Sequence, residues 1–207
     1  MFSMFSPDSK TMQIISRVTD LILLNIIFLI TSLPLFTVGA ATTAMYTLCF
    51  QMMREEGSGI LKSYFRAFKE NFKQGTAIWL VILLIVLPAL FYFDRVFRMD
   101  GILRFASLFF MLIAAAGLLT AGYVFPWISQ FRNTAAQSLQ NALILSITHL
   151  PRSVCILVIN LLPVILWAVN YDLFEKISFL WLALYFAAAA YMNTGLLWHV
   201  FKPYREK

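Results

Sequence analysis

The feature that most constrains this chain is a series of apolar stretches, each long enough to cross a lipid bilayer. A transmembrane helix needs about 20 mostly apolar residues. Four stretches meet this requirement plainly, at residues 75–93, 102–128, 153–171 and 177–200. With 61% hydrophobic and 13% charged residues, the 207-residue chain has too little polar surface to cover a water-soluble globule. The sequence therefore predicts an all-α, polytopic membrane helix bundle.

A further apolar region, residues 12–53, is about twice as long as one span and contains a proline near its middle. Proline lacks a backbone N–H and disfavours helix at the residue before it. We interpret the region as two helices, 12–33 and 37–53, joined by a tight turn near the outer surface, with Pro34 and Gly39 as the candidate helix break. The chain is then a single transmembrane domain, residues 1–207, with about six spans.

The distribution of positive charge separates this interpretation from one long span over 12–53. Lys and Arg gather in the short cytoplasmic loops of membrane proteins. With six spans and both termini in the cytoplasm, twelve of the 16 Lys and Arg residues face inward, and four face outward: Arg95, Arg98, Arg104 and Lys176. One long span would lower this asymmetry to ten against six. The charges therefore favour six spans.

Aromatic residues agree with this orientation, because Trp79, Trp127 and Trp198 fall near the predicted inner interface. The alternative for the N-terminus is a cleavable signal peptide, with a small-residue cleavage site at 38–40. Because the apolar pattern continues to Phe50, we favour retained helices.

The loop before the third expected span has the pattern of an amphipathic helix. Between residues 60 and 73, apolar side chains recur at steps of three and four, and basic side chains occupy the other faces. Such a helix lies in the membrane interface, where its bases meet anionic lipid or a cytoplasmic partner. A second amphipathic stretch is expected in the next inner loop, 129–152. The candidate partner or lipid surface of the first stretch consists of Lys62, Phe65, Arg66, Phe68, Lys69 and Lys73.

The expected spans contain few groups that could perform chemistry. Apart from Asp20, about two turns into the first span, no acidic or basic side chain lies deep in any of the six. Since ion and proton relays use such groups, an ion-coupled mechanism is disfavoured. Uncharged polar side chains instead bridge helices or line a cavity for a small neutral solute. The candidate polar path consists of Asn25, Thr42, Asn160 and Asn193.

Signatures of catalysis and cofactor binding are missing from the sequence. The two histidines, His149 and His199, lack the Cys or Glu spacing of a zinc site. The two cysteines, Cys49 and Cys155, lie in apolar runs, which is typical of packed thiols. The basic residues are spread over several loops and form no long basic arm. We therefore expect a protein that is not an enzyme, with no cofactor, no metal and no nucleic-acid partner.

Several motifs occur together in the first half of the chain. They are Ser32, Leu33 and Pro34, the run 37–44, then Glu55, Glu56 and Gly57, and the cluster Phe65, Arg66, Phe68, Lys69, Asn71 and Phe72. In combination they resemble the YesL-like family of bacterial integral membrane proteins, a domain of unknown function, and the resemblance extends over most of the chain. Because members are often encoded beside carbohydrate-uptake transporters and sensor kinases, it implies a bacterial inner-membrane location and a setting in carbohydrate uptake.

A second likeness concerns the loop that begins at residues 134–136 and ends at Leu150 and Pro151. It looks like the cytoplasmic coupling loop of ABC-importer permeases, which docks on the ATPase, although the initial Glu and the Gly of that motif are missing. The leading expectation is thus a non-enzymatic inner-membrane accessory or regulatory protein. Its partners would be the lipid bilayer and ABC-type sugar transporter subunits or a sensor kinase. The alternative is a small-solute transporter or permease-like subunit with a polar path between helices.

Overall fold

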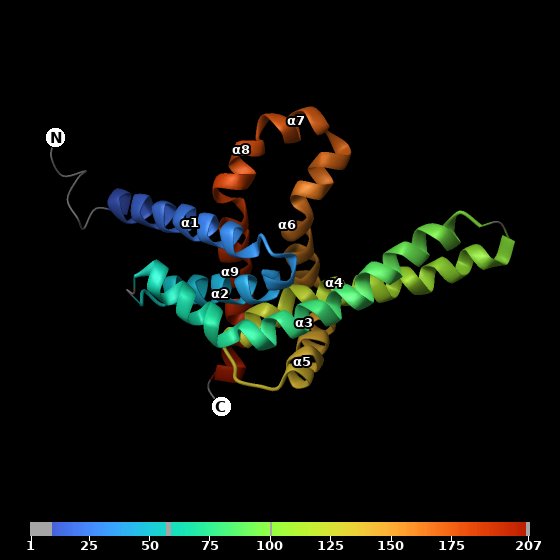
Figure 1. Cartoon of the computed structure of the whole chain (residues 1–207), viewed down its shortest axis with the longest axis horizontal. Coiled ribbons are helices and arrows are strands. Elements are labelled where there is room, and N and C mark those ends of the chain that lie inside the picture. The colour runs from blue at the N-terminus through green and yellow to red at the C-terminus, as the bar shows by residue number, and fades with distance from the viewer. Residues whose placement is uncertain (1–9, 57–58, 100, 206–207) are drawn as a thin grey trace.

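The computed structural model describes residues 10–56, 59–99 and 101–205, and this part of the chain is almost entirely helical (Figure 1). Its helices are α1 Lys10–Ser32, α2 Val38–Met53, α3 Ile60–Phe97, α4 Ser107–Ile128, α5 Ala135–Thr148, α6 Leu150–Val169, α7 Tyr171–Lys176, α8 Ser178–Leu180 and α9 Phe186–Arg205. Short 3-10 segments, η2 Leu35–Thr37 and η3 Gly101–Ala106, precede α2 and α4. A π-helical turn, η4 Trp181–Tyr185, joins α8 to α9. The predicted all-α class is confirmed for the described residues.

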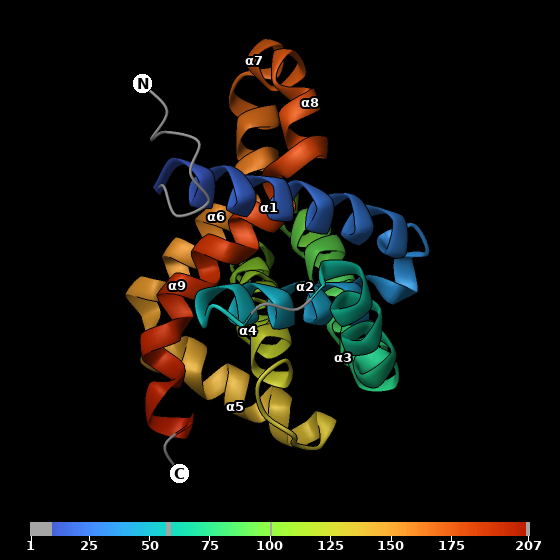
Figure 2. The same ribbon diagram turned by 90° about the vertical axis from the view of Figure 1, so that its left-hand side faces the viewer.

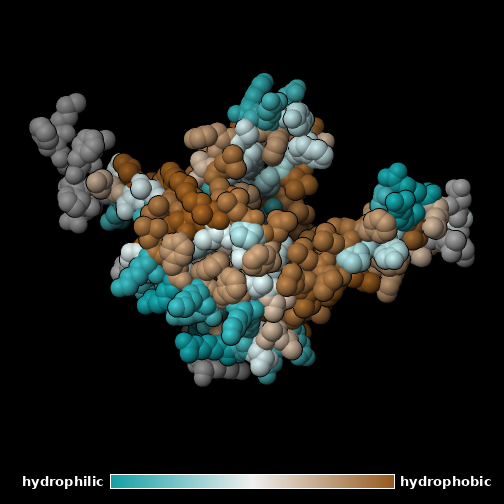
Figure 3. All heavy atoms as spheres, viewed as in Figure 1, coloured by the Kyte–Doolittle hydropathy of each residue, from teal (hydrophilic) through white to brown (hydrophobic). Residues whose placement is uncertain are grey.

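Within the described residues, five helical segments are long and apolar enough to cross a bilayer. They are Thr11–Ser32, Ile60–Phe97, Arg104–Ile128, Leu150–Val169 and Ser178–Arg205. Figure 3 shows hydrophobic residues covering most of the visible surface of the α3–α4 hairpin and of α1. Such a surface is stable only where lipid covers it, so the protein is a multi-pass membrane protein. The expected second span corresponds to α2, which has 16 residues, most of them buried inside the bundle.

Two helical hairpins project from this bundle in different directions. One consists of α3 and α4, and the other of α6 and α8–α9, with α7 at its tip (Figure 1). Figure 2 shows the α3–α4 hairpin nearly along its length while α7 stays at the top, so the two tips lie far apart. At the base of the hairpins, α2 contacts α1, α3, α4 and α9, and α5 connects α4 to α6. The centre of the bundle is therefore α2.

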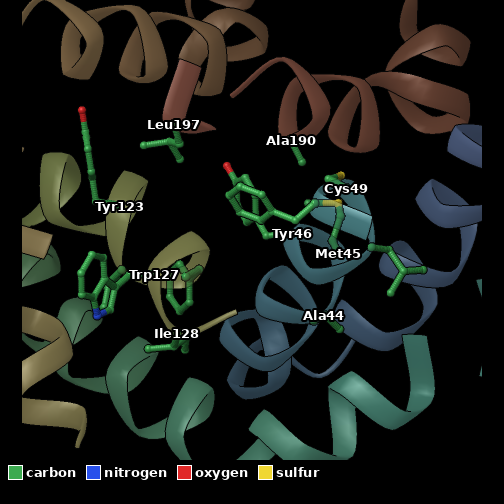
Figure 4. Close-up of a cluster of buried hydrophobic side chains, with 14 of the residues drawn as sticks. Ala44, Met45, Tyr46, Cys49, Tyr123, Trp127, Ile128, Ala190 and Leu197 are labelled. Carbon is green, nitrogen blue, oxygen red and sulfur yellow. The ribbon is translucent and has the colours of Figure 1, made fainter. Parts of the chain in front are cut away.

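Large side chains from distant segments fill the space around α2. Tyr46 and Cys49 of α2, Tyr123 and Trp127 of α4 and Leu197 of α9 belong to one cluster of buried side chains (Figure 4). Aromatic rings from the same region stack, as Phe50 does on the ring of Phe201, with centroids 6.0 Å apart. These contacts join segments that lie about 150 residues apart in the chain.

Residues 60–73, predicted to form an amphipathic helix before the third span, are the first part of α3. This helix runs without interruption for 38 residues, a length of about 57 Å at the usual rise per residue. Gly75 lies inside this helix although glycine is a poor helix former, and its missing side chain lets Gly39 and Ala40 of α2 approach its backbone. The basic half of α3 and its apolar half therefore form one rod.

At the predicted break, α1 ends at Ser32 and α2 begins at Val38, so Pro34 lies between the two helices. Gly39 is not part of the break, because it lies inside α2 and serves the close approach to Gly75. The structure also shows which part of α3 the turn contacts. The Trp79 Nε1–H donates to the Leu35 carbonyl at 2.8 Å, so the turn lies beside the middle of α3.

The sequence-based placements of Trp79 at the inner interface and of the Pro34 turn at the outer surface are therefore mutually exclusive. Both lie at the same level of the bundle, and α3 continues from Trp79 to Phe97 over about 27 Å. That distance nearly equals the thickness of a bilayer core. The α1–α2 hairpin packs against the first half of α3 and leaves the second half to α4.

Candidate functional site

Two of the four residues of the predicted polar path meet in the core. Asn193 of α9 donates its Nδ2–H to the Asn160 Oδ1 of α6 at 2.8 Å and to the Tyr46 hydroxyl of α2 at 3.2 Å. Asn193 is completely buried, and its Oδ1 has no hydrogen-bond partner among the described residues. The amide thus joins three helices that are distant in the sequence.

The other two residues of the predicted path, Asn25 and Thr42, form hydrogen bonds with backbone groups. The Thr42 hydroxyl donates to the Val38 carbonyl of its own helix at 2.7 Å. Asn25 of α1 donates its Nδ2–H to the Leu182 carbonyl at 2.6 Å, and its Oδ1 accepts from the Ala187 N–H at 3.0 Å. A π-turn interrupts the regular helical hydrogen bonds, so the buried Asn25 supplies partners that the backbone of η4 and α9 would otherwise lack. Asn25 and Thr42 thus use these polar atoms on backbone groups.

A cavity of about 330 Å³ lies beside the Asn193 cluster, with walls from α1, α2, α3, α4, α6 and the η4–α9 segment. Most of its lining is apolar or aromatic, as at Trp79 and Phe125. Its polar groups come from Thr42, Tyr46, Asn160 and Tyr185, and no acidic, basic or histidine side chain is among the lining residues. The Tyr185 hydroxyl donates to the Ile159 carbonyl and is thereby held in place. Such a cavity suits an uncharged guest.

Sequence reasoning missed Tyr46 and Tyr185, because a tyrosine inside an apolar run is more often packing than function. One signal was available for the first of them. Thr42 and Tyr46 stand four residues apart and therefore share one face of α2. No pattern in the sequence marks the π-turn that brings Tyr185 to the cavity.

The predicted partner or lipid surface lies along the first half of α3. Its four bases, Lys62, Arg66, Lys69 and Lys73, are exposed, and none forms an ion pair with a described residue. The two predicted aromatic residues differ. Phe65 is 51% exposed. Phe68 is partly buried against the core, where it stacks on the ring of Tyr64.

Next to this surface, a polar groove of about 320 Å³ separates α3 from the loop between α4 and α5. Its lining includes Glu70, Gln74, Arg132 and Asn133. The Gln74 amide donates to the Asn133 carbonyl at 2.9 Å and to the Ser138 hydroxyl at 3.3 Å. These bonds fasten the basic half of α3 to the start of α5, so the two predicted amphipathic stretches lie together. Hydrophilic residues gather over the first half of α3 in Figure 3.

The fold and these sites define a helical, multi-pass membrane protein. A family model described as "Protein of unknown function, DUF624" matches residues 21–95. The chain is similar to that family over most of α1, over α2, and over nearly all of α3, a segment that includes the Pro34 turn and the basic surface. No curated protein and no solved structure matches the chain.

Proposed function

We propose that this chain is a non-enzymatic accessory or regulatory protein of the bacterial inner membrane, serving a carbohydrate-uptake or sensing system. The observation that carries the proposal is a basic surface whose four bases form no ion pair with a described residue, on a helix that continues directly into an apolar half long enough to enter the bilayer. The setting in carbohydrate uptake rests on the resemblance to the YesL-like family. The partner is a transporter subunit or sensor kinase with an acidic surface.

The arrangement of α3 and α5 supports a docking role. Like charges on the exposed face of α3 repel one another unless lipid phosphate or an acidic partner lies opposite them. The α4–α5 loop adds a second element, because Thr134 and Gln137 form a capping box that starts α5 sharply beside the groove. This short helix between two spans fits the likeness to an ABC-importer coupling loop. A partner that bound both elements would act on α3, a single continuous helix that also enters the membrane.

A small-solute transporter or permease-like subunit is the alternative, and the cavity beside Asn193 is the observation in its favour. A solute path needs polar groups at successive depths of the bundle. Asn25 and Thr42 instead use their polar atoms on backbone groups. The geometry therefore supports the accessory role more strongly.

The double reversal Lys69→Glu with Lys73→Glu tests the docking surface. Each base near an anionic surface contributes about 1 kcal/mol, so losing two lowers affinity by about 2 kcal/mol, or about 30-fold. We expect recovery of co-purified transporter or kinase subunits from gentle detergent to fall at least about tenfold, as measured by quantitative mass spectrometry. Expression and the elution volume of the variant should not change, because both side chains are exposed.

The matched control reverses the same amount of charge at the other end of the helix hairpin, with Arg95→Glu and Arg104→Glu. Both residues are exposed and lie near the α3–α4 tip. This variant should keep its partners. Equal losses in both variants, or no loss in the first, would count against a docking site on α3.

The orientation can be tested with single cysteines in a background where Cys49 and Cys155 are replaced by alanine. Arg17 donates to the Met52 carbonyl at 2.8 Å and pairs with Glu55 at 3.6 Å, so both ends of the α1–α2 hairpin return to one level. Cysteines at Glu56 and Asn133 should react with an impermeant maleimide after the membrane is opened. Those at Met99 and Asp172 should react in intact spheroplasts. The opposite pattern would overturn the cytoplasmic assignment of the termini.

The same experiment applied to Phe36 tests how deep the hairpin reaches. The turn is apolar and open, with Leu33 and Leu35 each 78% exposed, which suits contact with lipid better than contact with water. We expect Phe36→Cys to resist the impermeant reagent from both sides and to react with a lipid-soluble maleimide. Labelling in intact spheroplasts would instead mean that the hairpin crosses the whole bilayer.

A further inference from the structure

The cavity beside Asn193 contains a hydrogen-bond donor that the protein does not use. Tyr46 is 4% exposed and lines the cavity. Its oxygen accepts from the Asn193 Nδ2–H, and no described residue accepts the Tyr46 O–H. Burying a hydroxyl donor without an acceptor is costly, so buried donors are normally paired. An acceptor from outside the chain would complete this group.

Asn160 supplies a second donor at the same place. Its Oδ1 accepts from Asn193, which fixes the amide so that its nitrogen is directed elsewhere. That nitrogen donates to no described residue. Asn160 lines the cavity and is also exposed, so it stands at the open side of the cavity, on α6. The two donors thus belong to one cavity and are held by one buried amide.

The walls limit the guest to uncharged molecules with a large apolar part. No ionisable acidic or basic side chain lines the cavity, and a charge moved there from water would lose its hydration without compensation. Phe28, Trp79, Phe125 and Phe186 supply aromatic surface. The volume of about 330 Å³ lies within the range of ligand pockets. A purely hydrocarbon guest would fill the space but would leave both donors unpaired.

We propose that this cavity binds an uncharged amphipathic molecule, an apolar body with a carbonyl or ether oxygen, and that Tyr46 and Asn160 donate hydrogen bonds to that oxygen. The apolar body lies between the aromatic walls, and a longer chain leaves through the open side toward lipid. The proposal does not depend on the docking surface of α3, because the two sites use different residues.

The test uses the purified full chain in detergent and three photoreactive probes with the same diazirine-bearing C16 chain: a methyl ester, an alkane and a free fatty acid at neutral pH. Mass spectrometry locates the cross-links. We expect the ester to label peptides that line the cavity, and unlabelled ester to compete at least about tenfold better than unlabelled alkane. The charged fatty acid should label the cavity least. Because this comparison uses the unaltered protein, it does not depend on any variant folding.

Two variants then assign the interaction. Tyr46→Phe keeps the ring and removes the donor, so labelling by the ester should fall about five- to tenfold, the usual effect of one hydrogen bond. Ala121→Leu fills the cavity and should abolish labelling. Tyr123→Phe is the matched control, since it removes a buried hydroxyl that contacts Ser153 outside the cavity. Thermal unfolding confirms that each variant is folded.

Three results would overturn the proposal. Cross-links of the ester probe that lie only outside the cavity would show that the probe binds elsewhere. Equal competition by ester and alkane would show that an acyl chain occupies the cavity without recognition of its oxygen. Equal labelling of the Tyr46→Phe and Tyr123→Phe variants would remove the role of the Tyr46 donor.

Discussion

Replacing Gly39 by alanine should lower the free energy of unfolding by at least about 3 kcal/mol. A Cβ at this position would lie 2.2 Å from the Gly75 carbonyl oxygen and 2.6 Å from the Trp79 Cβ. The nearer neighbour is backbone in the middle of a helix, so it cannot rotate away as a flexible side chain would. The α1–α2 hairpin would have to move off α3. Overpacking of a core usually costs about 1–3 kcal/mol, and a backbone displacement adds to it.

Thermal unfolding in detergent, followed by tryptophan fluorescence, measures the effect. For a chain of this size, 3 kcal/mol corresponds to a fall in melting temperature of about 6–12 °C. Gly195→Ala is the matched control, because Gly195 also lies inside a helix and a Cβ there meets nothing within 4 Å. That change should leave stability unchanged or raise it by about 0.5–1 kcal/mol. If the Gly39→Ala and Gly195→Ala variants have the same melting temperature, the close approach of α2 to α3 is not a feature of the protein.

Replacing Asn25 by leucine should destabilise the protein by about 2–6 kcal/mol, although the side chain keeps the same branching and the same number of heavy atoms. Asn25 is completely buried, and both its polar atoms bond to backbone: the Leu182 carbonyl and the Ala187 N–H. Leucine would leave these two groups without partners in an apolar environment, at about 1–3 kcal/mol each. The loss should be concentrated at the π-turn, because Leu182 lies in η4 and Ala187 lies at the start of α9.

Hydrogen exchange shows which backbone amides lose protection, whereas the melting temperature reports only the stability of the whole protein. In the Asn25→Leu variant the amides of η4 and the start of α9 should lose protection, while α4 keeps it. Thr42→Val is the control, because it removes a hydroxyl bond within one helix and should cost less than about 1.5 kcal/mol. Unchanged exchange at the Ala187 amide would show that Asn25 is not what stabilises the turn.

Hydropathy and charge in the sequence were sufficient to predict the class of this protein and the approximate position of its helices. A bilayer offers no hydrogen bonds to the backbone, so an apolar stretch of span length has little choice but helix. Residues 153–171 were expected as a span, and α6 covers Leu150–Val169. Pro34 was expected at a break, and α1 ends two residues before it, because a missing N–H and a steric clash act locally. Causes of this kind act within a few residues, so they can be recognised in the sequence.

Contacts between helices settled the rest, and these depend on segments far apart in the chain. Gly75 was expected at the start of a span, and in the structure it lies inside one continuous helix, where Gly39 of α2 approaches its backbone. Asn25 and Asn193 were equal candidates for a polar path. Packing against a π-turn gives Asn25 a backbone duty, while Asn193 joins Asn160 and Tyr46 beside a cavity. Asparagine is the same residue type in both places, so its role follows from the groups that folding places within about 3 Å of its amide.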